Sequence, residues 1–128
     1  MVARWDFEHV DGQIVRDSSG NGLDGRLVGD AHIENDPDGG GRVLSLDGDE
    51  DWVDCGQDAK FDITSEITNV CWIKVNRFDE PFQMVISKGN SAWGINRSKS
   101  GGELWFGCFG VDLREGQDGN LCGTIDVH

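Results

Sequence analysis

Apolar residues recur along the chain in short segments separated by clusters of Gly, Asp, Asn and Ser. This punctuation is typical of sheets built from hairpins, because such residues adopt the backbone angles that tight turns need. No helix longer than one turn is predicted, so the expected fold class is all-β. The pattern predicts strands near Arg4–Glu8, Gly25–Val28, Val43–Asp47, Trp52–Cys55, Thr68–Arg77, Phe82–Lys88, Ala92–Arg97, Glu103–Phe109 and Leu121–Val127.

The most apolar of these segments is the run from Val70 to Ile73, which includes Cys71 and Trp72. A continuous apolar run of this length is consistent with a strand buried on both faces. We therefore expect Cys71 and Trp72 in the core. By the same reasoning Trp5 and Trp52 are expected in the core or at its rim.

Four cysteines are present, at Cys55, Cys71, Cys108 and Cys122, and no two are spaced as C-x-x-C. A structural zinc site is therefore not expected. Cys55 closes a predicted strand and is expected to be a buried thiol. Cys108 and Cys122 lie on successive predicted strands, where a disulfide is one possibility that spacing alone does not decide.

Composition narrows the class of protein further. A chain of 128 residues suits a single domain spanning 1–128, and its 19 glycines disfavour helices. Its 24 Asp and Glu against 11 Lys and Arg give a net charge of -13. That charge repels phosphates and argues against a nucleic-acid partner. No segment is long and apolar enough to insert into a membrane, and the first residues do not resemble a signal peptide.

Four regions, taken in order, resemble the laminin G-like group of the concanavalin A-like lectin/glucanase superfamily. The resemblance implies an antiparallel two-sheet jelly-roll sandwich, found in extracellular or cell-surface proteins and often binding carbohydrate. The matching segments are Trp5–Glu8 with Asp17–Gly25, Val43–Gly48 with Trp52–Val53, Ile67–Lys74, and Ile86–Gly89 with Ala92–Ile95.

The resemblance stops near the strand at Gly102–Phe106. In the family, a further strand, a Trp-His-His segment and more strands follow, whereas this sequence stops at Asp126–His128. We therefore expect a jelly roll that lacks its last strands and exposes edges and apolar faces. Another copy of the chain, or a separate chain, is expected to cover them; a shorter sandwich is the alternative.

The loop from Asp17 to Asp24 is the richest in oxygen ligands. Calcium is bound by six to eight oxygens, and the resemblance implies that this corner holds a structural calcium ion through Asp17 and Asn21. The alternative is that Asp17 and Ser19 cap the turn through its own backbone. A second acidic run, Asp47–Asp51, lacks EF-hand spacing and is expected to be a solvated hairpin.

Sugars present both an apolar ring face and hydroxyl groups, so their binding sites combine aromatic and polar side chains. Trp93 and Trp105 each lie beside glycine on a predicted strand, and Asn96 and Arg97 follow Trp93 closely. These four are the candidate ligand-binding residues. Packing of the two tryptophans in the core is the alternative.

Catalytic signatures are missing from the sequence. Glycosidases of the superfamily carry a Glu-x-Asp-x-Glu strand with two carboxylates on one face, and this chain has no such strand. The three histidines are expected at the surface and not in a Ser-His-Asp triad; they are His9, His32 and His128. The sequence thus predicts a non-catalytic carbohydrate- or glycan-binding module. A protein-interaction or assembly module with no sugar site is the alternative.

Overall fold

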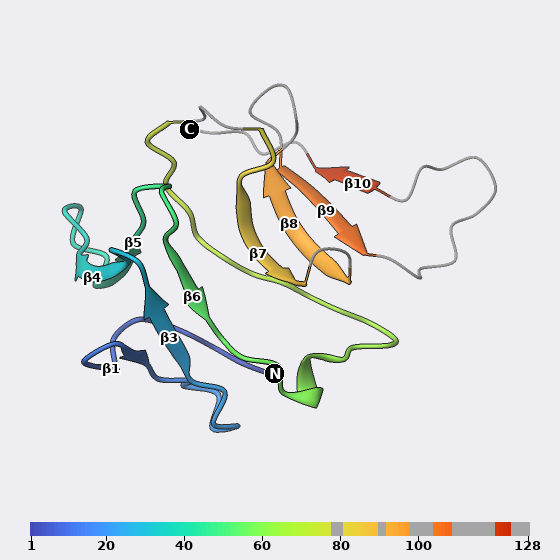
Figure 1. The fold of residues 1–128 in the computed structure, drawn as a ribbon, viewed down its shortest axis with the longest axis horizontal. Helices are drawn as coiled ribbons and strands as arrows, with labels where there is room; N and C mark the ends of the chain where they lie inside the picture. Colours follow the sequence, from blue (N-terminus) through green and yellow to red (C-terminus); the bar gives the residue numbers. More distant parts are fainter. Residues whose placement is uncertain (78–80, 90–91, 98–103, 109–119, 124–128) are drawn as a thin grey trace. The chain divides into compact units, whose positions relative to one another are not determined.

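The computed structural model describes residues 1–77, 81–89, 92–97, 104–108 and 120–123 (Figure 1). Within these residues the regular structure is antiparallel β apart from one 3-10 turn, η1 (Ala59–Phe61), which confirms the all-β prediction. The chain divides into two compact units, unit 1 (Met1–Ile67) and unit 2 (Thr68–His128). Among the described residues, no helix has the length and apolar character needed to span a membrane.

Unit 1 contains a four-stranded sheet and a separate hairpin. The sheet has the order β1-β2-β3-β6, and the hairpin pairs β4 with β5. Every pairing is antiparallel. The bounds are β1 (Val10–Asp11), β2 (Ile14–Val15), β3 (Gly25–Val28), β4 (His32–Asn35), β5 (Arg42–Ser45) and β6 (Trp52–Asp54).

The core of unit 1 forms where these strands turn their apolar side chains to the same side. Val15 is fully buried and clusters with Leu27 and Ala31. Strand β3 shows the alternation expected of a half-buried strand, since Leu27 is buried while its neighbour Arg26 is exposed. Partly buried side chains complete the cluster: Trp5, Phe7, Val10, Ile33, Leu44 and Val53.

Gly25 allows a close approach between β3 and the neighbouring side chains. A Cβ atom at this position would lie 2.5 Å from Cγ1 of Val53 and 3.4 Å from Sγ of Cys55. The Val53 distance is far below ordinary van der Waals contact, so any side chain at position 25 must displace Val53. Glycine here is required by packing and not by the backbone angle.

The hairpin of β4 and β5 was not fully expected, because His32–Asn35 is mostly polar and only Ile33 is partly buried. Its connecting turn is organised by Asp36. The Asp36 carboxylate accepts hydrogen bonds from the N–H groups of Asp38 and Gly40, and the Asp36 N–H donates to the Gly41 carbonyl. These bonds close the turn locally, so β4 forms without an apolar pattern of its own.

The predicted strand at Arg4–Glu8 is wrong. These residues have no strand structure, and Phe7 has a φ of +61°, which interrupts an extended chain. The segment is nevertheless anchored: Trp5 packs near Phe61, with ring centroids 6.3 Å apart, and its indole N–H donates to the Leu23 carbonyl over 2.9 Å. The prediction that Trp5 lies at the core or its rim is confirmed.

The predicted strand at Thr68–Arg77 is also wrong. Residues 68–77 have no regular secondary structure, and Trp72 is 91% exposed. Cys71 is exposed as well. The prediction that Trp72 and Cys71 are core residues therefore fails, because an apolar run forms a buried strand only where a second strand pairs with it.

Unit 2 contains a four-stranded antiparallel sheet of order β10-β9-β8-β7. Its strands fall within or overlap the predicted ones, and residues 124–127 of the last prediction lie outside the described residues. A bulge interrupts the β7–β8 register between Met84 and Ile86. The bounds are β7 (Met84–Lys88), β8 (Trp93–Arg97), β9 (Leu104–Cys108) and β10 (Asn120–Gly123).

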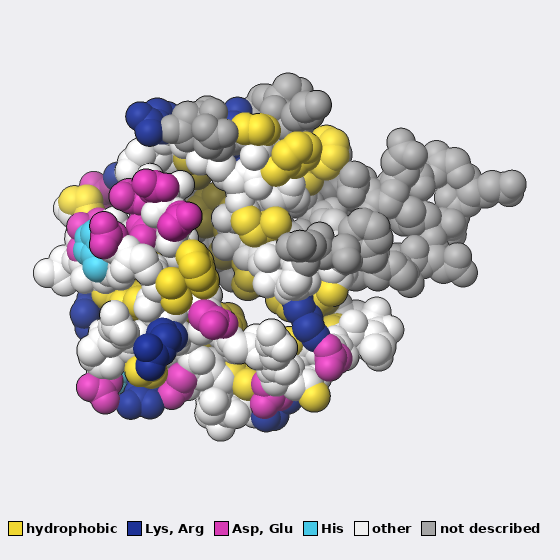
Figure 2. All heavy atoms as spheres, in the orientation of Figure 1, with side chains coloured by type: hydrophobic (Ala, Val, Ile, Leu, Met, Phe, Trp, Pro, Cys, Tyr) yellow, Lys and Arg dark blue, Asp and Glu magenta, His cyan; other side chains and the backbone are white. Residues whose placement is uncertain are grey.

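Charge is divided unequally between the two units. Unit 1 holds 17 Asp and Glu against 5 Lys and Arg, whereas unit 2 holds 7 against 6, so 12 of the 13 net negative charges belong to unit 1. Figure 2 shows acidic side chains gathered over the part of unit 1 that carries β4 and β5. Unit 2 is close to neutral by comparison.

Replacing Gly25 with Ala tests the packing of unit 1. We expect Gly25→Ala to lower the free energy of unfolding by about 1–3 kcal/mol, because the added methyl group overpacks the space next to Val53. Arg26→Ala, at the adjacent exposed position, is the matched control and should change it by less than about 0.5 kcal/mol. Urea denaturation measures both; equal stability of the two variants would contradict the close approach.

Candidate functional site

The register of β8 and β9 determines how the four predicted ligand-binding residues lie. Asn96 is directly opposite Trp105, and Arg97 is opposite Leu104. Opposite residues in an antiparallel pair share a face, and successive residues of a strand alternate between faces. Asn96 and Trp105 therefore lie on one face of the unit 2 sheet, and Trp93 and Arg97 lie on the other.

The face that carries Trp93 and Arg97 is mostly apolar, although Lys88 of β7 also lies on it, opposite Trp93. It also presents Ile95 from β8, Leu104 and Phe106 from β9, and Ile86 from β7, according to the same register. Leu104 is 8% exposed, which identifies it as a core residue. A face of this composition is suited to packing, so it favours the alternative that Trp93 is a core residue.

The opposite face combines one aromatic side chain with small and polar ones and with the exposed Met84 of β7, which lies opposite Asn96. Beside the Asn96–Trp105 pair, Gly94 lies opposite Gly107, and Ser87 of β7 lies opposite Gly94. The two paired glycines place no side chain on this face next to Trp105. Glycine inside a strand often marks a place where a ligand or another backbone approaches closely. We call this surface, made of Ser87, Gly94, Asn96, Trp105 and Gly107, the Trp105 face.

Polar groups of the Trp105 face are only partly satisfied within the protein. The Asn96 side chain donates from Nδ2 to the Arg97 carbonyl over 3.1 Å. The Trp105 indole Nε1 is buried and has no hydrogen-bond partner in the described part of the chain. A buried donor without an acceptor is uncommon in folded proteins and suggests a bond to water or a ligand. Trp105 thus combines a partly buried indole ring with a buried N–H group that has no partner among the described residues.

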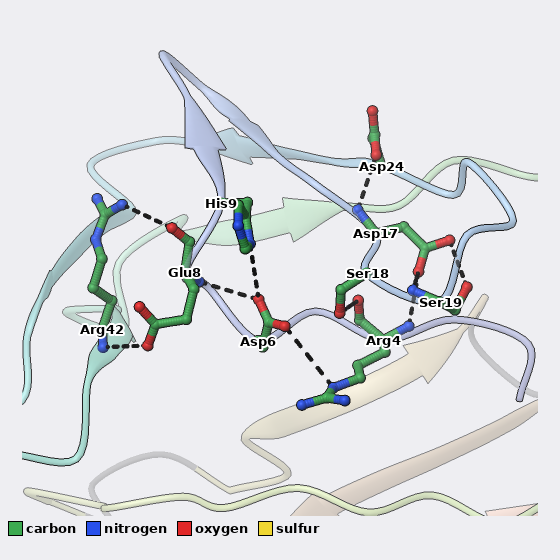
Figure 3. A network of polar contacts seen from close by, with 9 residues as sticks. All are labelled: Arg4, Asp6, Glu8, His9, Asp17, Ser18, Ser19, Asp24 and Arg42. Carbon is green, nitrogen blue, oxygen red and sulfur yellow. Dashed lines mark hydrogen bonds and ion pairs between the residues drawn. The ribbon is translucent and has the colours of Figure 1, made fainter.

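The predicted calcium corner is organised around the Asp17 carboxylate (Figure 3). Its Oδ1 accepts hydrogen bonds from the N–H groups of Arg4 and Ser19, over 3.0 and 2.8 Å. Its Oδ2 accepts from the Ser19 hydroxyl at 2.8 Å and the Leu23 N–H at 3.0 Å. The Asp17 N–H in turn donates to Oδ1 of Asp24 over 2.9 Å. The carboxylate joins both ends of its own loop to the segment that contains Arg4.

Further bonds tie the same loop to the first residues of the chain. Asn21 donates from Nδ2 to the carbonyls of Met1 and Val2, over 3.2 and 2.8 Å. The Ser18 N–H donates to the Arg4 carbonyl over 2.8 Å. Asn21 therefore donates hydrogen bonds to the backbone of Met1 and Val2. Together with Ser18, it holds the start of the chain up to Arg4, the first residue of the segment that was predicted to be a strand.

The continuation of that segment is held by charged side chains (Figure 3). The Asp6 carboxylate lies 3.9 Å from Nε of Arg4 and 3.9 Å from Nδ1 of His9. The Glu8 carboxylate accepts from the Arg42 N–H at the start of β5 over 3.0 Å. Sequence reasoning missed this role of Glu8, because its partner is 34 positions away and no local pattern signals the pairing.

The environment of Asp17 favours its ionised form. Partial burial raises the pKa of the Asp17 carboxyl, but the hydrogen bonds from the Arg4, Leu23 and Ser19 groups together outweigh burial and hold the pKa well below its ordinary value of 3.8. The pKa of Asp24 is lowered as well, first by the Asp17 N–H and then by Arg16, whose Nη1 lies 2.7 Å from Oδ2 of Asp24. Both carboxylates remain charged down to acidic pH.

Calcium binding by Asp17 and Asn21 stays a prediction. The observed contacts fit the alternative, in which Asp17 and Ser19 cap the turn, because the Asp17 oxygens already accept four hydrogen bonds. A cation at this carboxylate would have to displace some of those donors. Among the described residues, no group of three His, Cys, Asp or Glu side chains is arranged to hold a metal ion. Thermal melting with calcium and with a chelator tests the prediction.

The second acidic run is also organised by main-chain donors. The Asp51 carboxylate accepts hydrogen bonds from the N–H groups of Asp30 and Asp47, and Asp47 accepts from the Asp49 N–H. The Asp47 N–H is the largest cause of the lowered pKa of Asp51. These carboxylates therefore close a turn beside β6.

The cysteines differ in their surroundings. Cys55 is partly buried, and burial, followed by the charge of Asp54, raises its pKa to about 11, so its thiol is unreactive at neutral pH. On β10, Cys122 lies opposite Trp105, three residues along β9 from Cys108. A disulfide between Cys108 and Cys122 stays a possibility predicted from the sequence.

Changing Asp17 to Asn tests its role in unit 1. Asparagine keeps one acceptor oxygen and places an NH2 group against existing donors, so we expect Asp17→Asn to lower the free energy of unfolding by about 1–3 kcal/mol. Asp49→Asn, at an exposed acidic position, removes the same charge and should have little effect. Thermal melting of both variants at neutral pH tests this expectation. Equal midpoint temperatures of unfolding for Asp17→Asn and Asp49→Asn would contradict the role assigned to Asp17.

The same carboxylate predicts how stability depends on pH. Because the pKa of Asp17 is lower in the folded chain than its ordinary value of 3.8, its contribution to stability is complete above that value and is lost as the pH falls below it. Urea denaturation of the wild type between pH 6 and pH 2 should show this loss. The loss should be smaller in Asp17→Asn, and parallel curves would contradict the assignment.

Comparisons with known proteins do not identify a function, so any proposal about function rests on the geometry described above. No family model matches the chain, and neither the curated proteins nor the solved structures searched contain a match. The resemblance to the laminin G-like group therefore stays a prediction from the sequence.

Proposed function

We propose that this protein is a non-catalytic carbohydrate-binding module with a jelly-roll β-sandwich fold of the extracellular, laminin G-like kind. The observation that supports it most is the cross-strand pair of Asn96 and Trp105 on a glycine-bearing sheet face. Of the four residues predicted from sequence, this pair lies on the face that also carries Ser87, Gly94 and Gly107. The proposed ligand is a glycan that contacts the Trp105 face.

The chemistry of this face suits a pyranose ring. The C–H groups of the ring stack on an indole, as apolar surface does on any large aromatic side chain. Ring hydroxyls both donate and accept, so they complement the Asn96 amide, and a hydroxyl oxygen is a suitable acceptor for the Trp105 N–H. Gly94 and Gly107 present no side chains that would hold a flat ring away from the sheet.

Four carboxyl groups of the described chain have structural roles. The pKa values of Asp6, Asp17, Asp24 and Asp51 are all lowered. These four acids are ionised at neutral pH and accept hydrogen bonds that hold loops in place, which is a structural role.

The alternative, an assembly module without a sugar site, is favoured by a different observation. The segment after unit 1 exposes Val70, Trp72, Ile73 and Val75. Exposed apolar side chains grouped in this way are typical of protein-interaction surfaces. The two functions use different parts of unit 2 and are separable by mutation.

Substitution of each tryptophan in turn tests the proposal. A glycan array first identifies a ligand for the wild type, and calorimetry then measures its affinity. We expect Trp105→Ala to weaken binding at least about ten-fold, which corresponds to about 1.4 kcal/mol. Trp105→Phe keeps the stacking surface but loses the N–H, so its loss should be smaller.

The matched control is Trp93→Phe, which changes the same residue type to the same extent on the opposite face of the sheet. It should alter glycan affinity by less than about two-fold, with folding of every variant checked by circular dichroism. Equal losses in Trp93→Phe and Trp105→Phe would contradict the assignment of the site to the Trp105 face. A wild-type protein that binds no glycan on the array would contradict the function itself.

A further inference from the structure

The most exposed apolar stretch of the described chain is Ile67–Val75, which we call the Trp72 segment. Trp72 is 91% exposed, Val70 is 71% exposed, and Ile73 and Val75 are each 42% exposed. In the part of the chain that the structure describes, no strand pairs with this segment. Its composition is nevertheless that of a strand, rich in β-branched and aromatic residues. The segment therefore has the composition of a strand, and among the described residues it is not paired in a sheet.

Charge indicates which partner this segment suits. Two copies of a chain with a net charge of -13 repel each other, but unit 1 carries 12 of those charges. Within the Trp72 segment the one charged residue is Lys74, and Glu66 and Arg77 flank it at opposite ends. Contact through this segment therefore brings two copies together where repulsion is weakest.

The order of residues in the segment is also self-complementary. In a two-fold interface, if one residue lies opposite a second, the second also lies opposite the first. With Cys71 at the two-fold axis of an antiparallel pair, Val70 lies opposite Trp72 and Ile67 lies opposite Val75. These four apolar side chains then meet one another, whereas Ile73 lies opposite Asn69.

Other two-fold registers match less well. Centring the pair on Trp72 places Val70 opposite Lys74 and Asn69 opposite Val75, which sets apolar side chains against polar ones. Register in a sheet is selected by the match of apolar positions. The sequence of the segment thus favours the pairing centred on Cys71.

We propose that two copies of this chain associate through antiparallel pairing of their Trp72 segments, with the two Cys71 residues adjacent at the two-fold axis. The strand that the sequence predicts over these residues then forms at the interface between copies. This inference is independent of the proposed glycan site, which uses β8 and β9.

The size of the surface indicates a reversible dimer. A tryptophan buries 150–250 Å² when fully covered, so the two copies of Trp72 together contribute about 300–500 Å². Specific interfaces bury about 1,200–2,000 Å² in total, and smaller ones belong to transient complexes. We therefore expect dimerisation that depends on protein concentration.

Sedimentation velocity of the full chain over a range of concentrations tests the proposal. We expect a shift from monomer to dimer with rising concentration, and at least ten-fold weaker association for Val70→Thr combined with Trp72→Thr. Leu46→Thr is the matched control, because Leu46 is a 46% exposed apolar residue of unit 1. It should associate like the wild type, and circular dichroism confirms that each variant is folded.

Cross-linking tests the register. Directly opposite residues in a non-hydrogen-bonded antiparallel pair have Cα atoms about 4.5 Å apart, within the range that a disulfide spans. Mild oxidation should therefore give a covalent dimer of the wild type and of Cys55→Ser but none of Cys71→Ser. Cys71→Ser should still associate reversibly.

Two results would overturn the inference. One is a wild-type chain that stays monomeric at every concentration. The other is a dimer that persists in the Val70→Thr, Trp72→Thr variant and does not cross-link through Cys71, since that dimer would use another surface.

Discussion

The Asp17 carboxylate fixes the geometry of unit 1, because its two oxygens receive donors from its own loop and from the first residues of the chain. The segment that it holds carries Trp5, whose indole packs near Phe61 and donates to the Leu23 carbonyl. Trp5 in turn covers the cluster around Val15. A small sheet of short strands thus gains part of its core from a segment that is not a strand, and one ionised side chain positions that segment.

This arrangement explains which parts of unit 1 were predictable from sequence. Strand β3 was predicted with its observed bounds, because Gly25–Val28 alternates between buried and exposed positions, as a half-buried strand does. The segment Arg4–Glu8 was predicted as a strand from its apolar residues, yet it is held by distant partners such as Asp17, Leu23 and Arg42. Local pattern carries no information about such partners. The loop itself was correctly singled out for its oxygen atoms, and the structure shows N–H groups around them.

Unit 2 was predictable in its strands and less so in its faces. The spacing of Trp93, Asn96, Arg97 and Trp105 suggested a common surface, but whether two residues on different strands share a face depends on register, and register depends on the pairing of the whole sheet. A shift of the pairing by one residue would move every side chain of a strand to the other face of the sheet. Once the register is known, the composition of each face is the basis on which we propose a packing role for Trp93 and a binding role for Trp105.

The failure of the prediction over Thr68–Arg77 has the same physical origin. A strand is stable only when its backbone groups pair with those of another strand. The apolar run Val70–Ile73 provides side chains that a sheet could bury, but it does not determine which strand pairs with it. Trp72 is accordingly exposed in the single chain, and the pairing of two copies that we propose would supply the missing partner. Because the negative charge is concentrated in unit 1, the near-neutral unit 2 is the part of this acidic chain where a second copy can approach at the lowest electrostatic cost.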